Sequence, residues 1–206
     1  MVLDNMMKRS SLVIGTLGVL VLWICAWLFF PPVVSSNARI PNSADAIARG
    51  EYLVIAGGCI SCHRSVEDEV SFAGGLGIET EFGTFYAPNI TPDIETGIGS
   101  WSPQDFLRAL KHGRTPTGNF YYPTFPYRAY AGLIEQDVLD MAAYLLSLEP
   151  VSYRAPEAQV SRWLFRWTIA GWNRLADLSQ AERESFDEEL VARGAYLARN
   201  LAHCDE

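Results

Sequence analysis

The longest apolar run of the chain covers residues 10–30, SSLVIGTLGVLVLWICAWLFF, without a charged side chain or a histidine. A helix of this length would span about 31 Å, which matches a hydrocarbon core of about 30 Å. Lys8 and Arg9 precede the run and predict a transmembrane anchor whose N-terminus stays in the cytoplasm. A cleaved signal peptide is the alternative, because SNA at 36–38 supplies small residues for a peptidase. In both cases the rest of the chain is exported.

Beyond the anchor, apolar positions recur at helical spacing in three stretches, 42–58, 99–113 and 135–150. Ser43 is placed to cap the first stretch. The second has Ser102 as its cap, Asp105 three residues later and Gly113 as its end. Pro150 follows the third stretch, whose apolar stripe faces one side. The pattern therefore predicts three main helices.

The sequence CISCH at 59–63 follows the first predicted helix directly. Cys59 and Cys62 fall on neighbouring parts of one helical turn, within reach of the two vinyl groups of a haem. His63 comes next and is placed to bind the iron from one face. The spacing predicts covalent attachment of haem c, which also suits an exported domain.

The cysteine pair has three other interpretations. A thioredoxin-type redox pair needs a βαβ setting, and none precedes Cys59. A zinc site needs about four ligands, and outside the motif the chain offers only His112, His203 and Cys204. A structural disulfide would not require the histidine. The haem interpretation is preferred over all three.

The segments between the predicted helices are long and rich in glycine, proline, asparagine and aromatic residues. Loops of such length usually count against a compact domain. A large apolar cofactor would serve as the core around which they wrap, so the haem prediction removes this objection.

The net charge of the chain limits the kinds of partner that it could bind. The 206 residues carry a formal net charge of −8, and 49% of them are hydrophobic. This acidic balance argues against a nucleic-acid-binding surface, and a partner steered by charge would be basic.

The loops and the last predicted helix carry a specific resemblance. FGTFYAPNITPDIETGIGSW (82–101), FYYPTFPY (120–127) and DVLDMAAYLLSLEPV (137–151) resemble the first haem domain of the multihaem cytochrome c subunits of membrane-bound periplasmic dehydrogenases, of the alcohol and gluconate type. The likeness covers residues 46–151. It implies an all-α fold, a class I cytochrome c domain with three main helices and long loops around one covalently bound haem, behind the N-terminal transmembrane helix.

The resemblance also implies roles for particular residues. Cys59 and Cys62 would form the thioether bonds, and His63 would be the proximal iron ligand. The expected haem-pocket residues are Tyr86, Asn89 and Trp101.

The distal iron ligand departs from the family pattern. Relatives place a methionine where this chain has Phe125 or Leu133. Met141 and His112 are the remaining candidates, and an open sixth position is the third possibility. Because a methionine raises the haem potential relative to a nitrogen ligand, the potential stays open.

An internal repeat sets the expected domain boundaries. RGEYLVIAGGCISCH (49–63) and RGAYLARNLAHCDE (193–206) both open with Arg-Gly-x-Tyr-Leu and reach a cysteine. The expected organisation is an anchor at 10–30, a cytochrome c domain at 40–151, a connector at 152–180 and the truncated start of a second cytochrome c domain at 181–206. Cys204 would attach a second haem only if the natural chain continues past Glu206.

The leading functional hypothesis is electron transfer without catalytic residues of the chain's own. We expect the protein to lie in the inner membrane, with its haem domain in the periplasm. It takes electrons from the catalytic subunit of a partner dehydrogenase and passes them toward quinone, a terminal oxidase or another cytochrome. The alternatives are a haem enzyme of the thiosulfate or peroxide type with an open or exchangeable sixth iron site, and a sensor or haem-carrying structural module.

Overall fold

The computed structural model describes residues 2–29, 34, 36–66, 71–160, 169–173 and 188–204. The chain divides into two compact units, Met1–Pro32 and Val33–Glu206. The described part of the first unit is one helix, α1 (Val2–Phe29), whose described side chains from Leu12 to Trp27 are all exposed. The part of the chain that the structure describes holds no helix with both the length and the hydropathy of a membrane span.

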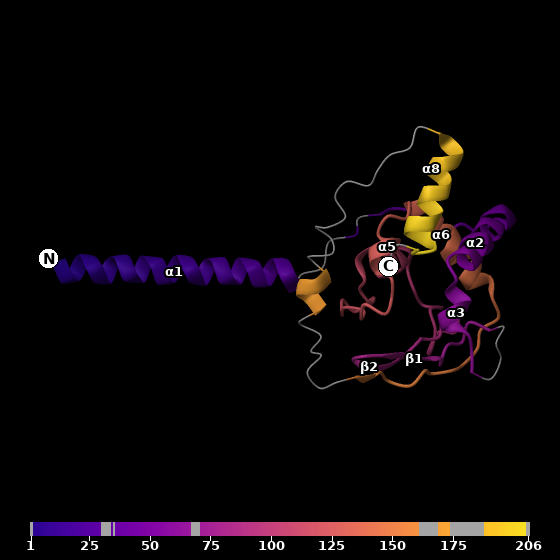
Figure 1. Cartoon of the computed structure of the whole chain (residues 1–206), viewed down its shortest axis with the longest axis horizontal. Coiled ribbons are helices and arrows are strands. Elements are labelled where there is room, and N and C mark those ends of the chain that lie inside the picture. Colours follow the sequence, from indigo (N-terminus) through magenta and orange to yellow (C-terminus); the bar gives the residue numbers. More distant parts are fainter. Residues whose placement is uncertain are drawn as a thin grey trace. The chain divides into compact units, whose positions relative to one another are not determined.

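Most of the regular secondary structure in the described part of the second unit is helical (Figure 1). Its helices are α2 (Ala44–Ala56), α3 (Cys59–His63), α4 (Pro103–His112), α5 (Tyr127–Tyr130), α6 (Glu135–Ser147) and α8 (Glu189–Tyr196), followed by a π-helical turn, η1 (Leu197–Leu201). Residues 169–173 are helical as well. Helix α2 packs against α6, and α4 packs against both α5 and α6.

The three predicted main helices are present as α2, α4 and α6, and the predicted caps are confirmed. Ser43 accepts a hydrogen bond of 3.3 Å from the backbone N–H of Ala46 at the start of α2. Ser102 and Asp105 form a reciprocal capping box at the start of α4. Gly113 ends α4 with a φ of 59°, a left-handed conformation that glycine adopts without strain.

Helices α2 and α6 cross at Gly50. A Cβ atom at this position would lie 1.9 Å from the backbone oxygen of Asp140, so only a glycine permits the close approach. Nε of Arg49 donates to Oδ2 of Asp140 at 2.6 Å beside the crossing. Asp140 is fully buried on α6, and this charge-assisted bond satisfies it there.

A small antiparallel sheet lies in a segment that the sequence predicted as loop. Strand β1 (Gly77–Thr80) pairs with β2 (Gly83–Tyr86), and β2 pairs with β3 (Gln159–Val160). Gly77 lies opposite Tyr86, and Gly83 lies opposite Val160. The expected all-α fold therefore has a sheet added to it. Each strand is too short to show alternating polarity, which explains why the pattern did not reveal it.

The segment 188–204 packs on the same unit as the three main helices. The η1 turn contacts α2 and α5, and Leu201 is completely buried in the core cluster. The parts of the predicted connector at 161–168 and 174–180, and the start of the predicted second domain at 181–187, lie outside the described residues.

Candidate haem site

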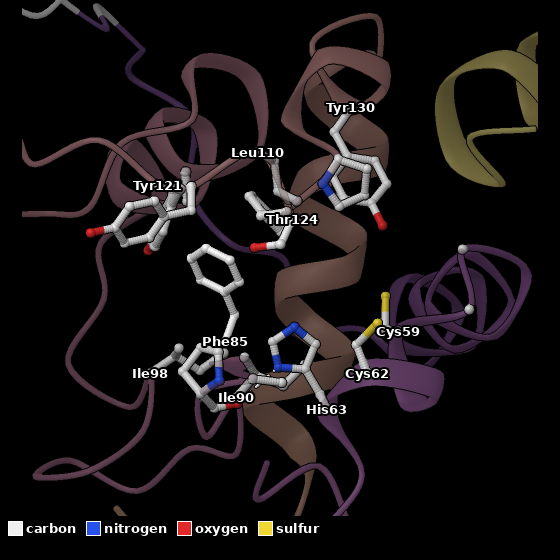
Figure 2. Close-up of a pocket in the computed structure, with 18 of the residues that line it drawn as sticks. Cys59, Cys62, His63, Phe85, Ile90, Ile98, Leu110, Tyr121, Thr124 and Tyr130 are labelled. Carbon is white, nitrogen blue, oxygen red and sulfur yellow. Dashed lines mark hydrogen bonds between the residues drawn. The ribbon is translucent and has the colours of Figure 1, made fainter. Parts of the chain in front are cut away.

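An apolar cavity of about 340 Å³ lies between α3, the sheet, α4 and α6. Its walls consist mainly of hydrophobic and aromatic side chains, among them Phe85, Ile90, Ile98, Phe106, Leu110 and Leu145. Figure 2 shows the motif residues Cys59, Cys62 and His63 on one side of this space. Large apolar pockets with a few polar groups at the wall are typical of cofactor sites.

Helix α3 positions the two cysteines. Gly57 ends α2, and Gly58 turns the chain with a φ of 64° so that α3 starts at Cys59. Both thiols are free and line the cavity. Desolvation raises the pKa of the Cys59 thiol to about 12 and also raises the pKa of Cys62. Both groups are therefore protonated at neutral pH, which disfavours thiolate chemistry of the thioredoxin type.

The ring of His63 is held in one tautomer. Its Nδ1 lies 2.8 Å from the backbone oxygen of Pro88, which can only accept, so Nδ1 carries the proton. Desolvation lowers the pKa of His63, although the bond to Pro88 opposes this shift. The imidazole is neutral and presents Nε2 as a metal ligand, the usual arrangement of a ligating histidine with a carbonyl partner.

The residues present fit a covalently attached haem. Two thiols three positions apart and a neutral imidazole lie at the wall of a cavity whose other walls are apolar. Within the described ranges, no three His, Cys, Asp or Glu side chains gather as a metal-binding group. The set of donors thus suits a ring that brings its own four iron ligands and needs only axial ones from the protein.

The predicted haem-pocket residues separate into two groups. Tyr86 and Trp101 line the cavity. The ring of Trp101 packs edge-on against Phe106, with centroids 5.3 Å apart. Asn89 is not among the lining residues and lies buried elsewhere.

The side chain of Asn89 connects its loop to the segment after α6. Its Nδ2 donates to the backbone oxygens of Val151 at 2.7 Å and Tyr153 at 3.2 Å. Its Oδ1 accepts from the backbone N–H and the hydroxyl of Thr91. The structure gives Asn89 the role of anchoring the loop that carries Pro88.

The candidates for the distal ligand lie in different places. Met141 lines the cavity from α6 and is 2% exposed. His112 is the last residue of α4 and is not among the lining residues. Phe125 lines the cavity too.

His203 also lines the cavity, and the sequence reasoning missed it as a site residue. The repeat pointed to its neighbour Cys204, which is exposed. Nothing in the sequence around His203 marks it as a haem-site residue. It reaches the cavity only through tertiary packing, because it lies far from the CISCH motif in the chain. Attachment of a second haem at Cys204 stays a prediction.

The fold and this cavity define a haem-binding cytochrome, and the family comparison agrees. The family model for cytochrome c matches residues 47–149, and the chain belongs to the cytochrome c family. Proteins of this family hold covalently bound haem c.

Similar curated proteins include a diheme cytochrome c-type protein of Cereibacter sphaeroides, 39% identical over 96% of this chain and 69% of the relative. The gluconate 2-dehydrogenase cytochrome c subunit of Pantoea cypripedii is 38% identical over 77% of this chain and 36% of its own length. The cytochrome c subunit of alcohol dehydrogenase (quinone) from Gluconobacter oxydans is 35% identical over 84% of this chain. The chain spans 37% of the length of that subunit. The second and third of these relatives are named as cytochrome c subunits of dehydrogenases.

Proposed function

We propose that this chain transfers electrons from the catalytic subunit of a membrane-bound dehydrogenase toward quinone, a terminal oxidase or another cytochrome. The observation that carries the proposal is the placement of two free thiols and one neutral imidazole at the wall of an apolar cavity. The names of relatives such as the gluconate and alcohol dehydrogenase cytochrome subunits support the kind of partner.

Haem c, when bound, supplies a one-electron iron couple. The residues of this chain attach it, orient it and exclude water from it. Cys59 and Cys62 would form the thioether bonds to the haem, and His63 would supply a nitrogen ligand to its iron. Tyr86 and Trp101 contribute to the wall, and the apolar lining keeps the local dielectric low.

We also assign the chain to the inner membrane, with its haem domain in the periplasm. The support is the uncharged run at 10–30 with Lys8 and Arg9 before it. The exposed apolar side chains of α1, such as Leu12 and Trp23, would face lipid in this arrangement. A cleaved signal segment is the alternative outcome of the localisation test.

A fusion of a reporter enzyme that is active only outside the cytoplasm, placed after residue 160, tests this assignment. We expect reporter activity in the membrane fraction. Activity released in soluble form would indicate cleavage of the first segment. Activity confined to a cytoplasmic reporter fused at the same position would contradict export.

Stopped-flow reduction tests the electron-transfer role. The oxidised, haem-loaded protein is mixed with the catalytic subunit of a gluconate or alcohol dehydrogenase and its substrate. We expect the haem spectrum to change to the reduced form only when subunit and substrate are both present. Turnover of peroxide or thiosulfate by the chain alone, with no reduction by any dehydrogenase, would instead support the haem enzyme.

A further inference from the structure

We infer that His203 is the distal axial ligand of the haem iron, an assignment that rests on the proposed attachment of haem at Cys59 and Cys62. His203 lies on the segment that follows η1, yet it lines the same cavity as His63. The segment 120–133 holds no methionine or histidine, so an axial ligand from the protein would come from another element.

The ring of His203 contacts a backbone carbonyl oxygen through Nδ1, as the ring of His63 does. Its Nδ1 contacts the backbone oxygen of Ala202, an acceptor, and therefore carries the proton. Nε2 keeps its lone pair and has no hydrogen-bond partner within the described part of the chain. Two histidines in one cavity thus each have Nδ1 bound to a carbonyl and Nε2 available for a metal.

Aromatic packing fixes the ring of His203 on another side of the cavity from His63. The ring stacks on Tyr130, with centroids 6.0 Å apart and planes inclined by 27°. Figure 2 shows Tyr130 and His63 on different sides of the open space. His63 and His203 therefore reach the cavity from different elements, as two axial ligands of one haem iron would have to.

The backbone around His203 is firmly anchored. Leu201, two residues earlier, is completely buried. It packs so close to Gly57 that a Cβ atom added there would lie 3.3 Å from the Leu201 side chain. Gly57 lies directly before the α3 segment with the motif cysteines. The anchor of His203 and the haem-attaching segment are therefore in contact through the core.

The conformation at His203 is strained. Its φ is 43°, and it is the one non-glycine residue with positive φ in the described ranges. It follows a π-helical turn, a rare element found often at functional sites. Strained conformations persist where surrounding packing imposes them, and they cluster at ligand-binding positions.

The two earlier candidates have simpler roles. Met141 lines the cavity from α6, but it is 2% exposed and belongs to the hydrophobic core together with Leu53 and Val54. His112 lies at the end of α4 outside the cavity lining, where its place at the helix C-terminus complements the dipole. Met141 would offer a thioether and not a nitrogen, and His112 is not in the cavity wall.

Spectroscopy of the haem-loaded chain tests the assignment. The chain has one complete Cys-x-x-Cys-His motif, so the spectrum reports one haem. We expect ferric electron paramagnetic resonance and near-infrared magnetic circular dichroism to show two nitrogen ligands. The His203→Ala protein should lose the low-spin signal, and added imidazole should restore it. The Met141→Leu and His112→Ala proteins should keep the wild-type signal.

The substitution His203→Met provides a second test with a different readout. A thioether ligand raises the haem potential relative to an imidazole. We therefore expect a methionine-to-iron charge-transfer band and a higher midpoint potential than in the wild type. This variant also covers the case in which His203→Ala does not fold.

Three results would overturn the assignment. They are a sulfur-ligated wild-type spectrum, a wild-type spectrum in both His203 variants, and loss of the low-spin signal in Met141→Leu or His112→Ala alone. The pyridine haemochrome spectrum separates these results from failure of the proposed function, because it reports thioether-bound haem whatever the distal ligand. Absence of such haem from the wild-type protein would refute the attachment and the ligand assignment with it.

Discussion

The hydroxyl of Tyr196 donates a hydrogen bond of 2.7 Å to Oδ2 of Asp137 and so fastens α8 to α6. The hydroxyl oxygen of Tyr196 also accepts a bond of 3.2 Å from the backbone N–H of Ile134. Nη1 of Arg193 lies 3.3 Å from the Asp137 carboxylate. This cluster positions the segment that leads through η1 to His203, so its removal should affect both stability and the haem site.

Tyr196→Phe removes the hydroxyl and leaves Asp137 with a weaker set of partners. Hydrogen bonds to charged groups contribute about 1.5–3 kcal/mol. We therefore expect the free energy of unfolding to decrease by an amount in this range. Urea denaturation measures the change, and the low-spin haem signal should become heterogeneous. Tyr52→Phe is the control, because Tyr52 is 53% exposed. Equal effects of the two substitutions would contradict the role of the cluster.

Gly50→Ala introduces a methyl group at the crossing of α2 and α6. The new Cβ would lie 1.9 Å from the backbone oxygen of Asp140, so the helices must separate. Overpacking of this kind typically costs about 1–3 kcal/mol, and we expect at least that loss in denaturant unfolding. Gly194→Ala is the matched control, since nothing lies within 4 Å of a Cβ at Gly194. A neutral effect at Gly50 would refute the close contact.

Asn89→Ala should reduce stability without removing the haem. The substitution leaves buried backbone groups near Val151 without their donor, and each such group costs about 1–3 kcal/mol. We expect a lower unfolding midpoint, with an unchanged haem absorption spectrum in the folded protein. Asn119→Ala alters an exposed asparagine and should have little effect. A large spectral change with unchanged stability would instead place Asn89 at the haem.

Asp105 gives the capping box of α4 a defined pH dependence. Burial raises the pKa of Asp105, but hydrogen bonds from Ser102 and the charge of Arg108 outweigh it and lower the pKa below its usual value. A lowered folded-state pKa means that the carboxylate stabilises the fold above the unfolded value of about 3.9. This contribution is lost as the pH falls through the folded value.

Asp105→Asn tests this dependence. We expect the wild type to be more stable than the variant at neutral pH, and the difference to disappear in acid below a pH of about 3.9. Urea unfolding at a series of pH values measures it. Glu95→Gln corrects for the loss of one negative charge at an exposed site. A difference that persists or grows in acid would contradict the sign of the shift.

Features set by neighbouring residues were predicted well from the sequence. The caps at Ser43 and Ser102 and the glycine at position 113 depend on local backbone geometry, and all three lie where expected. The cytochrome c fold and its haem c also followed from a local motif together with the family resemblance, and the family match confirms both.

Features set by distant packing were not predicted. Strand β3 pairs with β2 only because the chain after α6 returns to the sheet. The side chain of Asn89 turns away from the cavity and donates to the backbone oxygen of Val151. No residue near Asn89 in the sequence indicates this remote partner. His203 reaches the cavity because Leu201 is buried against α2, a contact between remote segments.

Intact-mass spectrometry of the protein, produced in a host that attaches haem, tests the central claim most directly. We predict one haem covalently bound per chain in the wild type, retained in the Cys25→Ala and Cys204→Ala variants and absent when Cys59 and Cys62 are both changed to alanine. A wild-type chain without bound haem, or a double variant that keeps it, would contradict the haem site described for this protein.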